Sequence, residues 1–174
     1  CSSDLEIDIM YNYFNLNNYD EVILYGHSTG GLIAILYQEY TENKINKIIL
    51  NSPWLHYKFK FIDHYLFNYF FYYVIPYLPE YDLTTNRSFK DNKYMLMLSN
   101  KFNINKLYKK NYNTPVISSW FRNIIKYQTD ISNNKIKLKY DTLILISDHT
   151  AKFKGAETGD EILDIEQHLK QISK

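Results

Sequence analysis

The sequence feature that most constrains the fold is the pentapeptide Gly26-His27-Ser28-Thr29-Gly30, which lies between two apolar stretches. Residues 21–25 (EVILY) form a short apolar run, typical of a strand that is buried on both faces. Residues 32–40 (LIAILYQEY) are predicted to form a buried helix. A strand followed so closely by a helix requires a sharp turn. We expect the small residues at 26 and 30 to let the two flanking segments approach without a Cβ clash.

Further apolar runs predict the remaining elements. Residues 47–50 (KIIL) and 142–146 (TLILI) are expected to be buried strands, and residues 4–14 and 161–172 to be amphipathic helices. The order strand, helix, strand favours a parallel crossover. Residues 51–134 are rich in aromatics, with helical stretches near 61–73 and 119–127 and no clear parallel strand. The predicted fold is therefore α/β, a parallel sheet with flanking helices.

The pentapeptide matches the pattern G-x-S-x-G, which in a strand–turn–helix context is the nucleophile elbow of serine enzymes. Such a turn pushes the Ser28 hydroxyl out of the backbone envelope, where a base can reach it. The backbone N–H of Thr29 opens the helix beside it and can stabilise an oxyanion, helped by the helix dipole. The competing interpretation is a tight turn that happens to contain a serine.

The segments VILYGHSTGGLIAILY and KIILNSP resemble the α/β-hydrolase group that contains lysophospholipases, monoacylglycerol lipases and serine aminopeptidases. KYDTLILISD and DEILDIEQ are similar to that group's next core strand and to the stretch that carries its acid. The resemblance implies a single domain over residues 1–174, incomplete at both ends, in which residues 53–135 form a helical cap insertion. It also implies that His27 is a supporting residue that packs and orients the turn, rather than the catalytic base.

The resemblance implies Ser28 as the nucleophile, and the order Ser, Asp or Glu, His along the chain places the acid after the last strand. Two aspartates qualify, and we favour Asp160, which begins DEIL, over Asp148. Asp160 also stands where a helix N-cap would, so a structural role competes with the catalytic one. No histidine follows in the expected position. The other histidines are not predicted as the base; they are His56, His64, His149 and His168.

The expected function is a serine hydrolase that cleaves ester or acyl bonds through a Ser28 acyl-enzyme. Two alternatives remain: a non-catalytic remnant or binding module, and an acyltransferase that uses the same serine. The aromatic cap suits a small ester or lipid-like substrate, although aromatic stretches more often serve as packing.

Composition excludes several other classes. The net charge is +1 without a basic block, so we expect no nucleic-acid partner. There is no nucleotide-binding glycine motif and no His or Cys cluster, so we expect no cofactor and no metal. The most apolar stretch, residues 65–78, is too short for a transmembrane span. Cys1 is the only cysteine and no signal peptide is visible, which favours the cytoplasm. We interpret the start at Cys1 as that of a fragment or of a gene that has lost its start.

Overall fold

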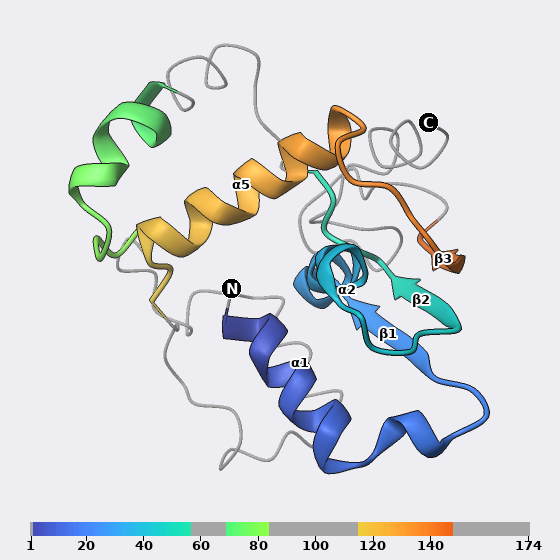
Figure 1. The fold of residues 1–174 in the computed structure, drawn as a ribbon. Coiled ribbons are helices and arrows are strands. Elements are labelled where there is room, and N and C mark those ends of the chain that lie inside the picture. Colours follow the sequence, from blue (N-terminus) through green and yellow to red (C-terminus); the bar gives the residue numbers. More distant parts are fainter. Residues whose placement is uncertain (1, 57–68, 84–114, 148–174) are drawn as a thin grey trace, which may run out of the picture. The chain divides into compact units, whose positions relative to one another are not determined.

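The computed structural model describes residues 2–56, 69–83 and 115–147 (Figure 1). These residues fall into two compact units. Residues 2–56 and 125–147 belong to the first unit, and residues 69–83 and 115–124 belong to the second.

The first unit is built on a parallel sheet of three strands in the order β1-β2-β3 (Figure 1). The strands are β1 (Ile23–His27), β2 (Lys47–Asn51) and β3 (Asp141–Leu145). His27 pairs with Asn51, and Asn51 pairs with Leu145, so the carboxyl ends of all three strands are aligned. The predicted parallel sheet is confirmed. The first strand, however, runs two residues further than expected, through Gly26 and His27, because its pairing with β2 continues to Asn51.

The core of this unit lies between the sheet and α2 (Thr29–Tyr40), which packs against β1 and β2. Helix α2 begins at Thr29, three residues earlier than predicted. Ser28 is therefore the only residue between β1 and α2. The buried apolar side chains here include Leu32, Ile35, Leu36, Ile48 and Leu50. The opposite face of the sheet carries apolar side chains that are roughly half exposed, namely Ile23, Tyr25, Leu143 and Leu145.

An N-terminal helix, α1 (Ser2–Tyr13), is tied to the end of α2 by polar contacts. The Tyr37 hydroxyl donates a hydrogen bond of 2.7 Å to the Asp8 carboxylate, and the Asn43 side-chain amide donates to the same oxygen. Burial raises the pKa of the Tyr37 phenol, and the neighbouring Asp8 carboxylate acts in the same direction. A short 3-10 helix, η1 (Leu16–Asn18), then leads toward β1.

The described part of the second unit contains a π-helical turn, η2 (Phe70–Val74), and a 3-10 turn, η3 (Ile75–Tyr77). It also contains the start of α5 (Ser118–Ser132), a longer helix than the predicted 119–127. The buried Ser118 hydroxyl donates to the Leu78 and Pro79 carbonyls. These bonds fix the start of α5 against the segment that follows η3.

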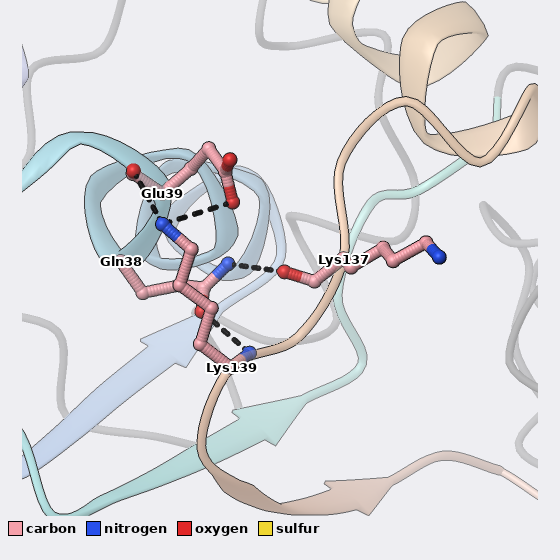
Figure 2. Close-up of polar contacts among 4 residues, drawn as sticks. All are labelled: Gln38, Glu39, Lys137 and Lys139. Atoms are coloured by element: carbon pink, nitrogen blue, oxygen red, sulfur yellow. Dashed lines mark hydrogen bonds and ion pairs between the residues drawn. The ribbon is translucent and has the colours of Figure 1, made fainter.

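A fully buried glutamine connects α2 with the chain that leads into β3 (Figure 2). Gln38 donates from Nε2 to the Lys137 carbonyl at 2.8 Å, and its Oε1 accepts from the Lys139 N–H at 2.9 Å. The Lys139 ammonium also donates to the Glu39 carbonyl and pairs with its carboxylate. The side-chain amide of Gln38 thus satisfies two main-chain groups of the segment that precedes β3.

Two glycines let α2 approach the sheet and the segment after β2. A Cβ atom on Gly26 would lie 2.5 Å from the Gly30 carbonyl oxygen and 2.7 Å from the Gly31 Cα. A Cβ atom on Gly31 would lie 2.6 Å from the Pro53 Cβ. The expectation for Gly30 is wrong, because nothing lies within 4 Å of the position where its Cβ would stand. Gly30 contributes its backbone to the close contact, and its lack of a side chain is not required there.

These distances predict opposite effects for two alanine substitutions in one motif. Gly26→Ala forces a methyl group against rigid backbone, and overpacking of this kind costs about 1–3 kcal/mol in free energy of unfolding. Gly30→Ala places its methyl in open space on a helix, where alanine is favoured over glycine by up to about 1 kcal/mol. Urea unfolding followed by circular dichroism measures both. Equal losses of stability in the two variants would contradict the packing described.

Candidate active site

Ser28 occupies the single turn residue between β1 and α2, and its backbone is strained. Its φ is 52° and its ψ is −120°. Three other described non-glycine residues have positive φ, and one of them, Asn15, lies in the ordinary left-handed helical region with ψ of 48°. The ψ of Ser28 lies far from that region, in a conformation that costs a residue with a Cβ about 1–3 kcal/mol. Strain of this size persists only where surrounding bonds fix the backbone.

Three backbone hydrogen bonds hold Ser28 in this conformation. Its N–H donates to the Asn51 carbonyl at 3.1 Å. Its carbonyl accepts from the Gly31 N–H at 3.0 Å and from the Trp54 N–H at 2.9 Å. Two of these partners come from the end of β2 and the segment after it, so the neighbouring strand imposes the turn on Ser28.

The Ser28 hydroxyl is not used by its own helix. Serine at the N-cap of a helix usually accepts a hydrogen bond from an N–H of the first turn. Ser28 is the N-cap of α2, yet its side chain makes no such bond, because its backbone is not in the extended conformation that capping requires. The residue is half-buried. The hydroxyl is therefore not committed to capping the helix.

The Thr29 N–H lies in the first turn of α2, where N–H groups have no acceptor within their own helix. No described residue accepts a hydrogen bond from it. The positive end of the α2 dipole lies at the same place. An N–H in this position is suited to bind a negatively charged oxygen next to the Ser28 hydroxyl.

His27 supports the turn, but it does so from an exposed position rather than the packed one expected. Its Nδ1 lies 2.9 Å from the Asn51 carbonyl oxygen. A carbonyl only accepts, so Nδ1 carries the proton in this contact. The Asn51 carbonyl thus receives hydrogen bonds from both His27 and Ser28. The missed residue Asn51 could have been found from strand register, because it is the β2 partner of His27.

Ser28 and Thr29 lie next to each other at the turn, and most of the other residues considered in the sequence analysis fall outside the described part of the chain. Asp160, Asp148, His64, His149 and His168 lie outside the described residues. His56 is described, is half-buried and has an interaction of its own.

Other kinds of site were sought in the same part of the chain. Within residues 2–56, 69–83 and 115–147, His, Cys, Asp and Glu side chains nowhere gather into a group that could hold a metal ion. None of the helices in these ranges combines the length and the apolar character needed to cross a bilayer.

Comparison with known proteins assigns the chain to a family. The sequence model of the family described as serine aminopeptidase, S33 matches residues 7–154. That range includes the strands, α2 and the turn at Ser28. The comparison with curated proteins gives no significant match.

A solved structure shares the fold. The crystal structure of the monoacylglycerol lipase from Paleococcus ferrophilus matches with a TM-score of 0.64 at 16% sequence identity. The match covers 98% of this chain and 59% of the lipase chain, so this chain spans about three fifths of the length of that lipase. Since the family match extends over most of the sequence and the sheet is parallel with flanking helices, the chain belongs to the serine aminopeptidase S33 family of the α/β-hydrolase superfamily.

Proposed function

We propose that this protein is a serine hydrolase that cleaves ester or acyl bonds, with Ser28 as its nucleophile. The observation that carries the proposal is the strained Ser28 backbone, with φ of 52° and ψ of −120°, held by three hydrogen bonds while its hydroxyl stays uncapped. Strained backbone that is fixed from several sides points to a functional residue. Membership of a hydrolase family supports the reaction class.

In the proposed reaction, the Ser28 Oγ attacks the substrate carbonyl carbon while its proton passes to a general base. The carbonyl oxygen becomes an oxyanion and accepts a hydrogen bond from the Thr29 N–H. The bond to the leaving alcohol then breaks, and the base returns its proton to that alcohol. Water attacks the acyl-enzyme by the reverse sequence, releases the acid and restores the serine.

The base in this scheme is a histidine oriented by an aspartate, for which Asp160 remains our first choice and Asp148 the second. A serine hydroxyl without a base is a weak nucleophile. The identity of the histidine is therefore the part of the proposal that an experiment must supply, whether it belongs to this chain or to a partner.

We propose a small ester or lipid-like molecule as the substrate. The solved relative is named a monoacylglycerol lipase, which supports a lipophilic ester. The predicted cap of residues 53–135 is rich in aromatic residues, which is consistent with a lipophilic substrate. Several of its described tyrosines are exposed, namely Tyr69, Tyr72, Tyr73, Tyr77 and Tyr81.

The first test is covalent labelling of the serine. A fluorophosphonate probe phosphonylates an activated serine with loss of fluoride, which intact mass spectrometry reads as one added group. We expect a single label on the wild-type chain and none on Ser28→Ala. Circular dichroism on both samples confirms that each is folded.

A folded wild-type chain that takes no label would overturn the proposal for this chain on its own and leave the elbow as architecture, as in a remnant or binding module. If labelling occurs, product analysis with an ester and an added alcohol distinguishes release to water from transfer to the alcohol. Exclusive transfer would replace hydrolysis by acyl transfer at the same serine.

The strain at Ser28 makes a separate prediction about stability. The angles 52° and −120° mirror an extended conformation, which glycine adopts freely and alanine does not. Ser28→Gly should therefore unfold with a free energy about 1 kcal/mol higher than Ser28→Ala, after the entropic cost of glycine is subtracted from the released strain. Thermal and urea unfolding of the two variants measure the difference. A less stable glycine variant would show that Ser28 is not strained.

A further inference from the structure

Two buried glutamines in the first unit hold main-chain groups, and they do so at different places. Gln38 is 0% exposed and Gln128 is 4% exposed. Gln38 holds the segment that leads into β3. Gln128, on α5, donates from Nε2 to the Trp54 carbonyl at 2.8 Å. Because a carbonyl only accepts, this contact also fixes which end of the Gln128 amide faces Trp54.

The Gln128 contact continues to the turn. The Trp54 N–H donates to the Ser28 carbonyl at 2.9 Å, so two successive hydrogen bonds connect Gln128 with Ser28. The Ser28 carbonyl and the Thr29 N–H belong to one peptide unit. A peptide unit is planar, so the direction of its C=O fixes the direction of its N–H. Holding the Ser28 carbonyl therefore aims the Thr29 N–H.

The other end of the Gln128 amide shows that stability alone does not explain this residue. Among the described residues, the buried Gln128 Oε1 has no hydrogen-bond partner. A hydrogen bond contributes about 0.5–1.5 kcal/mol, whereas an unpaired buried polar atom costs about 1–3 kcal/mol. The two ends of the side chain thus largely offset each other. Gln38, by contrast, satisfies both of its ends.

We propose that Gln128 is a positioning residue for the reaction: through Trp54 and the Ser28 carbonyl it orients the Thr29 N–H that receives the oxyanion. The inference rests on the proposed function and adds to it a residue that touches neither substrate nor nucleophile. It gives α5 a part in the reaction, although this helix carries neither the serine motif nor a predicted triad residue.

The test compares Gln128→Met with Gln38→Met, two near-isosteric changes that each remove a buried amide. In Gln128→Met, the second-order rate of fluorophosphonate labelling and the kcat for a short p-nitrophenyl ester should fall about tenfold, with KM unchanged. Complete loss of an oxyanion donor costs about 10²–10³ in kcat, and a misdirected donor should cost less. The melting temperature should change little. Gln38→Met should show the reverse, a lower melting temperature and an unchanged labelling rate of the folded protein.

Amide hydrogen exchange read by mass spectrometry gives a readout that needs no activity. Gln128→Met should raise exchange in peptides that cover residues 28–31, and Gln38→Met should raise it in peptides that cover residues 137–145. If the wild-type chain takes no label, the proposed function fails, and raised exchange at residues 28–31 still shows that Gln128 orders the turn. If Gln128→Met changes neither labelling nor exchange at the turn, the positioning role is overturned.

Discussion

The site depends on one peptide unit, the one that joins Ser28 to Thr29. The Ser28 carbonyl in this unit accepts hydrogen bonds from the N–H groups of Gly31 and Trp54. The Ser28 N–H, on the other side of the same residue, donates to the Asn51 carbonyl. Each bond contributes on the order of 1 kcal/mol, so three of them match the cost of the strained backbone. Asn51 ends β2 and Trp54 follows it, so two of the three bonds that hold the turn depend on the pairing of β2 with β1. Local sequence makes the turn possible, and the parallel pairing makes it stable.

The parts of this fold that were predictable are those that leave a local pattern. The apolar runs at β1, β2 and β3 and the apolar length of α2 predicted a parallel sheet with a packed helix, and Gly26 was expected to allow a close approach. A close approach at Gly31 was not expected. A side chain at this position would clash with Pro53, which lies twenty-two positions further along the chain. Gln128 and Trp54 were missed for the same reason. Their contact joins residues 74 positions apart, and neither periodicity nor a motif reports a contact of that kind.

The two faces of the described sheet have different importance for the site. Gly26 and the buried residues of β2 face α2, and this covered side holds the turn. On the other side, Ile23, Tyr25, Leu143 and Leu145 are roughly half exposed, although parallel sheets are usually covered on both faces. The geometry at Ser28 uses only main-chain groups and the covered side. His27 is the exception. Its exposed side chain donates a hydrogen bond to the Asn51 carbonyl, the same group that accepts from the Ser28 N–H.

In the proposed reaction, the turn would supply two of the components of acyl chemistry, the Ser28 hydroxyl and the Thr29 N–H as oxyanion donor, whether or not a base is in place. In serine proteases, an oxyanion hole and substrate binding alone leave about 10³–10⁴-fold catalysis over water when a triad member is removed. An elbow without a histidine would therefore still accelerate a reactive ester, while a fluorophosphonate, which needs an activated serine, would react slowly. Covalent labelling is for this reason a stricter criterion of a complete site than ester turnover. Comparing the rate of covalent labelling with the rate of ester turnover therefore separates the contribution of the base from that of the strained turn.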